Sequence, residues 1–162
     1  MKAITLLAAM TITLASCNCQ KKATEQTNLT AVEPNNSQIA MNQESALPVL
    51  EYEANTRGFF RKITVDNKTI AVINVRDGKP TTTHISDADW NELVTLYKSV
   101  NKDGLATLKA PSEKRFYDGA PIANFRVVTK EKTFESAAFD GGNPPAEIEK
   151  IVNKLIAIAD KQ

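Results

Sequence analysis

FFRKITVDNKTIAVINV, residues 59–75, contains two strand-like runs separated by a short polar turn sequence. The runs, 59–65 and 69–75, are rich in β-branched and aromatic residues, which favour β-strands. Residues 66–68 between them are Asp, Asn and Lys, a composition typical of a tight hairpin turn. The second run is apolar on both faces, which predicts that it is the central strand of the sheet. One face of the first run carries the large apolar side chains Phe59, Ile63 and Val65. The stretch therefore predicts an antiparallel hairpin.

Further strand-like runs precede and follow this hairpin. Residues 49–54 come before it, and residues 122–128 and 133–139 form a second pair of runs around the polar turn sequence 130–132. In the second pair, Phe125 and Val127 share one face, as do Phe134, Ser136 and Ala138. The sequence thus predicts five strands grouped around two hairpins.

Each hairpin is followed by an amphipathic helical pattern. The first begins at Ser86, which has the spacing of a capping box with Asp89. Its apolar stripe includes Trp90 and Tyr97, which we interpret as core residues rather than as a ligand-stacking pair. The second pattern lies in residues 143–162, with two prolines at positions that a first helical turn tolerates. The order of strands, helix, strands and helix predicts an α+β fold: an antiparallel sheet of four to five strands with two helices on one face.

The N-terminus has the anatomy of a signal peptide. Lys2 is followed by an uncharged apolar run from Ala3 to Ala15. This run is shorter than the apolar segment that a helix needs in order to span a bilayer. The run ends in Leu14-Ala15-Ser16-Cys17, which resembles the lipobox of bacterial lipoproteins. This resemblance implies that residues 1–16 are a signal peptide, removed on export, and that Cys17 is acylated and becomes the mature N-terminus, anchored in a lipid bilayer.

The second cysteine, Cys19, does not extend this motif into a metal site. A thioether sulfur at Cys17 would not bind a metal as a thiolate, and a C-x-C pair has too few ligands for structural zinc. Cys19 is then an incidental thiol or the source of an intermolecular disulfide. No cofactor is predicted, because phosphate-binding glycine loops are missing, and His84, the only histidine, excludes a site with several histidine ligands.

Composition divides the mature chain into a tether and a domain. Residues 17–47 are rich in polar residues and have few large apolar ones, which predicts a flexible tether after the lipidated cysteine. Residues 48–162 have the length of one ordinary domain. With 20 Lys and Arg against 19 Asp and Glu, the charge does not indicate a nucleic-acid partner.

Several motifs in residues 50–160 resemble small uncharacterised envelope domains of Bacteroidota. They include KRFYDGAP at 114–121 and FDGGNPP at 139–145. The resemblance implies a cell-envelope location and this fold, but no activity or catalytic residue. Because Asn18, not Asp, follows Cys17 and no acidic residue occurs before Glu25, analogy with lipoprotein sorting favours the outer membrane, facing the periplasm.

The most distinctive polar stretch, KRFYDGA at 114–120, combines cations, aromatics and a carboxylate in an expected loop. Such segments on a rigid scaffold often recognise partners. The candidate recognition residues are Lys114, Arg115, Tyr117, Asp118 and Arg57. A structural alternative is that Phe116 and Tyr117 plug the end of the sheet while Asp118 and Gly119 form a turn.

Two functions are consistent with these features. The first is a tethered binding module for an envelope protein or glycan, which needs no catalytic residue. The second is an envelope hydrolase that uses carboxylates such as Asp118 and Asp140. The hydrolase would require these two side chains to converge in a cleft, with at least one raised pKa.

Overall fold

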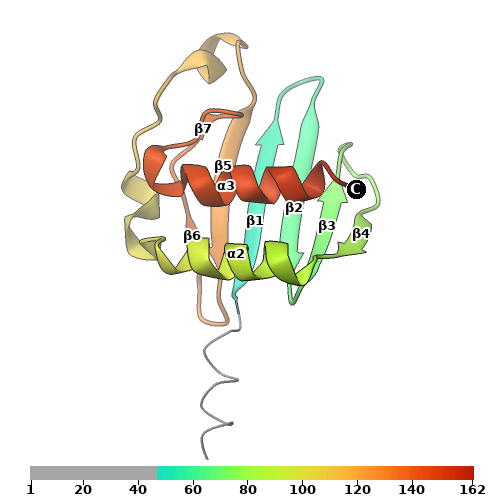
Figure 1. Ribbon diagram of the computed structural model, residues 1–162. Coiled ribbons are helices and arrows are strands. Elements are labelled where there is room, and N and C mark those ends of the chain that lie inside the picture. The colour runs from blue at the N-terminus through green and yellow to red at the C-terminus, as the bar shows by residue number, and fades with distance from the viewer. Residues whose placement is uncertain (1–46) are drawn as a thin grey trace, which may run out of the picture. The chain divides into compact units, whose positions relative to one another are not determined.

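Seven strands form one antiparallel sheet within residues 47–162, the part of the chain that the computed structural model describes (Figure 1). Along the sheet the order is β4-β3-β2-β1-β5-β6, and β7 also pairs with β5. The strands are β1 (Val49–Asn55), β2 (Phe60–Asp66), β3 (Thr69–Ile73), β4 (Thr81–His84), β5 (Ile122–Val128), β6 (Thr133–Glu135) and β7 (Phe139–Asp140). Several predicted features lie outside the described residues: the signal peptide, the lipidation site at Cys17, the second cysteine Cys19, and the tether up to residue 46.

Two α-helices, α2 (Asp87–Lys98) and α3 (Ala146–Ala159), cover the same face of the sheet (Figure 1). Two short 3-10 helices, η1 (Lys102–Thr107) and η2 (Lys114–Tyr117), lie between α2 and β5. The predicted α+β fold is confirmed, with its strands-helix-strands-helix order and both helices on one face. The strand count is higher than the predicted four to five.

Strand alternation explains which face the helices cover. In β1 and β5 every second residue is buried, and the two strands pair so that Tyr52 lies opposite Phe125. The helices contribute their own apolar stripes to this core, including Trp90, which is buried as predicted. The intervening residues of the strands face away from the helices. This face carries ion pairs, such as those of Arg126 with Glu53 and Glu135.

The first hairpin forms where the sequence predicts it. Asn67 and Lys68 both have positive φ angles, as a type I′ turn requires, and Asp66 pairs with Thr69 across the turn. Two details of the prediction are wrong. Phe59 precedes β2 and is 45% exposed, because no helix covers that end of the sheet. β3 is fully buried on one face only, at Ile70 and Val72, and the central strand is β1.

The predicted strand 133–139 is divided by a bulge. β6 pairs with β5 at Arg126↔Glu135, but β7 pairs at Ala123↔Phe139, so the register changes by one residue between them. The extra residue interrupts the strand pairing with β5. At the interruption, the Ala137 amide donates its hydrogen bond to the Leu105 carbonyl of η1 instead. β4, the other additional strand, is fully exposed and polar, so hydrophobic periodicity does not reveal it.

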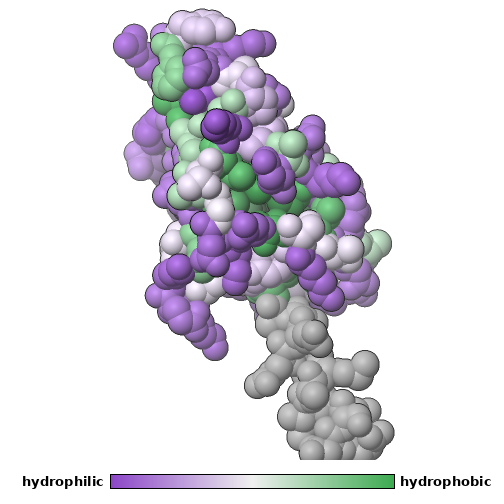
Figure 2. Space-filling model, turned by 90° about the vertical axis from the view of Figure 1, so that its left-hand side faces the viewer, coloured by the Kyte–Doolittle hydropathy of each residue, from purple (hydrophilic) through white to green (hydrophobic). Residues whose placement is uncertain are grey.

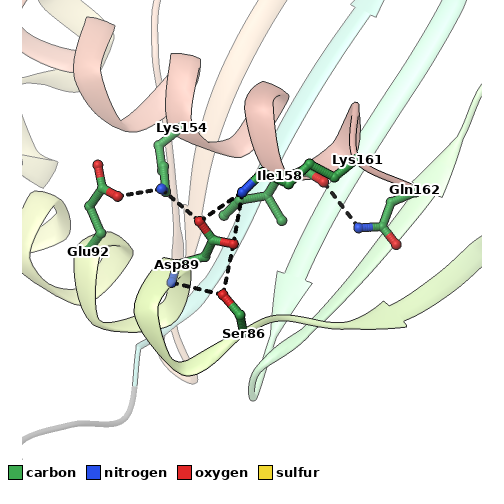
Figure 3. Close-up of polar contacts among 7 residues, drawn as sticks. All are labelled: Ser86, Asp89, Glu92, Lys154, Ile158, Lys161 and Gln162. Carbon is green, nitrogen blue, oxygen red and sulfur yellow. Dashed lines mark hydrogen bonds and ion pairs between the residues drawn. The ribbon is translucent and has the colours of Figure 1, made fainter.

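Asp89 connects the two helices, as Figure 3 shows. Its backbone amide donates to Ser86 Oγ over 3.1 Å, which confirms the predicted cap. Its carboxylate accepts hydrogen bonds from Lys154 Nζ of α3 at 2.8 Å and from Lys161 Nζ at 3.1 Å. Hydrogen bonds from Lys154, Ser86 and Lys161 hold the pKa of Asp89 well below its usual range. Thus Asp89, whose amide is capped by Ser86, also joins α2 to α3.

We expect Asp89→Asn to lower the Tm of the domain by about 4 °C, since a network of partly exposed ion pairs contributes on the order of 1 kcal/mol. Thermal unfolding followed by circular dichroism measures this change. Asp87→Asn is the control, because within residues 47–162 Asp87 pairs only with the exposed Lys68. An equal loss of Tm in both variants would show that the link to α3 contributes nothing.

Candidate binding site

The loops at one end of the sheet gather residues from four segments. Because the strands are antiparallel, the β1–β2 turn, the segment after β3, η2 and the start of β5 all lie at this end, at the top of Figure 1. The β1–β2 turn is tight: the Thr56 amide donates to the Phe59 carbonyl at 2.7 Å, which leaves Arg57 and Gly58 at its tip. We call this region the loop end.

A hollow of about 310 Å³ opens at the loop end, and we call it the arginine hollow. Its volume is near the lower limit of roughly 300 Å³ for small-ligand pockets. It brings together three of the five predicted recognition residues, Arg57, Arg115 and Asp118, but Lys114 and Tyr117 do not line it. The polar and apolar residues that line it include Arg57, Arg76, Arg115, Asp118, Asn55 and Ile122.

Sequence reasoning missed Arg76, which sits in the turn sequence RDGKP after β3. A signal for it was present. The turn at 66–68 makes β2 and β3 antiparallel, so the start of β2 and the end of β3 lie at the same end of the sheet. Arg57, just before β2, and Arg76, just after β3, therefore lie at that end together. The Arg76 guanidinium lies over the Phe60 ring, 5.5 Å from its centroid, and makes a long contact of 3.5 Å with the Thr56 carbonyl.

Asp140 anchors residues 112–115 at the loop end. Its carboxylate is 1% exposed and accepts hydrogen bonds from Ser112 Oγ at 2.5 Å and from the backbone amides of Lys114 and Arg115 at 2.7 and 3.0 Å. The Arg115 guanidinium adds an ion pair at 3.1 Å. Burial alone would raise the pKa of Asp140, but these hydrogen bonds outweigh it and hold the pKa well below its usual range. Asp140 is therefore an ionised structural anchor for η2.

The same anchor orients Arg115. Nη1 donates to Asp140 and, over 2.7 Å, to the Ser112 carbonyl, and the guanidinium lies 4.3 Å from the centroid of the Phe116 ring. A guanidinium carries five N–H donors. Within residues 47–162, Nη2 and Nε of Arg115 have no hydrogen-bond partner, although the side chain is only 10% exposed. Arg115 is thus held rigidly while part of its donor capacity is unused.

Exposed apolar side chains are concentrated at the loop end, and one of them, Ile122, lines the arginine hollow. Phe116 and Tyr117 are each 72% exposed, so they do not plug the end of the sheet. The predicted turn at Asp118 does form: its φ angle is +58° and the Gly119 amide donates to the Lys114 carbonyl. Figure 2 views the β6 and β7 edge of the molecule and shows hydrophobic residues beside strongly hydrophilic ones at the upper, loop end. All the large apolar side chains that are exposed in residues 47–162 belong to this end: Phe59, Val75, Phe116, Tyr117 and Ile122.

The geometry does not favour the hydrolase alternative. Asp140 is committed to four hydrogen bonds, has a lowered rather than a raised pKa, and does not line the arginine hollow. Asp118 is exposed at the end of η2. A general acid–base pair needs a carboxyl group whose pKa lies nearer the working pH. We therefore do not propose the hydrolase.

Among residues 47–162, no three His, Cys, Asp or Glu side chains lie together so that they could hold a metal ion. No helix in this described part of the chain has both the length and the apolar character needed to cross a membrane. Comparisons of the chain with models of protein families, with curated proteins and with solved structures found no match.

Proposed function

We propose that this protein is a lipid-anchored binding module of the bacterial cell envelope, with its recognition surface at the loop end of the sheet. The observation that carries the binding role is the arginine hollow, where Arg57 and Arg76 lie without a carboxylate partner in residues 47–162. Exposed aromatic side chains flank the hollow, and Arg, Tyr and Phe are enriched at protein interfaces. The partner is an envelope protein or glycan.

The anchoring role rests on the sequence Leu14-Ala15-Ser16-Cys17. Acylation at Cys17 with two or more chains gives stable attachment, whereas one chain gives only marginal binding. Outer-membrane attachment facing the periplasm is part of the proposal.

We expect the wild-type protein to fractionate with membranes, with acyl mass on its mature N-terminus, and Cys17→Ala to lose both properties. Membrane fractionation and intact-mass measurement test this, and Cys19→Ala is the matched control. A Cys17→Ala variant that stays in the membrane fraction, or a Cys19→Ala variant that leaves it, would refute the anchoring role.

The binding role is tested separately in cells. A photo-crosslinking amino acid replaces Tyr117 at the loop end or, as the control, Lys130 in the β5–β6 turn at the opposite end of the sheet. We expect discrete covalent adducts from position 117 and none of the same mass from position 130. The absence of adducts at position 117, or identical adducts at both positions, would contradict recognition at the loop end.

A further inference from the structure

A second, smaller hollow adjoins the arginine hollow. It has a volume of about 190 Å³ and is lined by residues 56–60 and 74–76, and we call it the side hollow. It shares Thr56, Arg57 and Arg76 with the arginine hollow. Its own lining includes Phe59 and Val75, which are 45% and 64% exposed. The loop end thus offers a cationic hollow and a partly apolar hollow on the two sides of the same two arginines.

Within residues 47–162, carboxylates neutralise the charge of the arginine hollow only in part. The chain has five arginines, and three of them line this one hollow. The other two, Arg61 and Arg126, are paired with carboxylates: Arg61 with Asp160, and Arg126 with Glu53 and Glu135. Arg115 is paired with Asp140, which does not line the hollow. Arg57 and Arg76 form no ion pair within residues 47–162, and Asp118 is the only carboxylate that lines the hollow.

The chemistry of these groups selects the ligand. Guanidinium groups bind carboxylates and phosphates through paired hydrogen bonds. A phosphate group carries a charge of about −1.5 to −2 at neutral pH, so it is both attracted more strongly by the arginines and repelled more strongly by Asp118 than a ligand carboxylate is. Charge alone therefore does not choose between the two anions, whereas the partly apolar lining of the side hollow favours a protein carboxylate with an apolar neighbour. The adjoining side hollow has room for an apolar side chain next to that carboxylate.

We propose that the loop end binds an acidic segment of a partner protein, with a carboxylate in the arginine hollow and a neighbouring apolar side chain in the side hollow. This inference rests on the proposed binding function and specifies the chemistry of its partner. Arg57 and Arg76 line both hollows and contact both parts of the ligand, while Arg115, fixed by Asp140, supplies a third guanidinium to the arginine hollow.

The test uses the acetylated, amidated peptide EFEE and the matched neutral peptide QFQQ as probes. Each is titrated into the isotopically labelled full chain, and backbone amide resonances are followed by NMR. We expect EFEE to shift resonances of residues 55–60, 74–76 and 115–122 in a saturable manner, and QFQQ to bind at least about tenfold more weakly, since charge-assisted hydrogen bonds are lost. Equal binding of the two peptides, or shifts elsewhere only, would overturn the proposal.

Variants identify the groups responsible. Arg57→Gln and Arg76→Gln are each expected to weaken EFEE binding about fivefold to tenfold, with more loss in the double variant. Lys130→Gln removes one positive charge at the opposite end of the sheet and is expected to leave binding unchanged. Both arginines are exposed, so their removal leaves the fold intact, which the amide spectrum verifies. Unchanged binding in the arginine variants, or an equal loss in Lys130→Gln, would overturn the proposal.

Inorganic phosphate is the third probe, and it separates this inference from the broader function. Saturable binding of phosphate at the arginine hollow, tighter than that of EFEE, would overturn the choice of an acidic protein segment. Photo-crosslinked adducts at position 117 that persist in the Arg57→Gln, Arg76→Gln variant would also overturn it, but would leave the binding module itself intact. The absence of adducts at position 117 would instead refute the binding module.

Discussion

Asp140→Asn is expected to lower the Tm of the domain by about 10 °C, because the variant leaves buried donors and the Arg115 guanidinium without their acceptor. An asparagine amide would also place N–H donors against the Lys114 and Arg115 amides. Thermal unfolding gives the size of the effect, and hydrogen exchange should show earlier opening of residues 112–117. Asp118→Asn is the control, since Asp118 is exposed and asparagine tolerates its positive φ angle. An Asp140→Asn protein as stable as Asp118→Asn would contradict the anchoring role.

The same anchor gives a pH dependence of defined sign. The pKa of Asp140 is lower in the folded chain than in the unfolded chain, where it should be about 3.9. As the pH falls, the unfolded state therefore takes up the proton first, and stability is lost in acid. We expect the stability advantage of the wild type over Asp140→Asn to be complete near neutral pH and to shrink from about pH 5 downward. An advantage that stays constant down to pH 3 would refute an ionised anchor.

A matched pair of substitutions separates the core from the recognition surface. Phe125→Ala in β5 should reduce the free energy of unfolding by about 3–5 kcal/mol, because the ring is fully buried opposite Tyr52. Phe116→Ala makes the same chemical change at a ring that is 72% exposed and stacks on Arg115, and should cost less than about 1 kcal/mol. Urea unfolding of both variants checks the difference. Similar losses in the two variants would contradict the assigned core.

The fold was predictable where one face of an element is buried. The alternation in residues 49–54 and 122–128 and the helical stripe with Trp90 each reflect burial against the opposite layer, so pattern and structure agree. β4 is exposed throughout, and β7 is two residues long beyond a bulge. These two strands form because β3 and β5 offer unpaired backbone groups to them. The local sequence of β4 and β7 carries no pattern that indicates this pairing.

The candidate site was partly predictable for a related reason. The composition of KRFYDGA identified a polar segment with aromatics, and the structure places Arg115 and Asp118 from it beside Arg57. Composition did not show which residues bind a ligand and which hold the segment in place. Asp140 has the sequence context of a turn residue, yet it is the buried acceptor that holds Arg115, because only the tertiary fold brings residue 140 to residues 112–115.

The direction of β1 has a mechanical consequence. The chain reaches the sheet at Val49, and the arginine hollow begins at Asn55, at the other end of a seven-residue strand roughly 23 Å long. A pull between an N-terminal membrane anchor and a partner held at the loop end would therefore run along β1. This central strand is hydrogen-bonded to β2 on one side and β5 on the other, with the bonds perpendicular to the strand. Load would be shared among these bonds in shear, rather than breaking them one at a time.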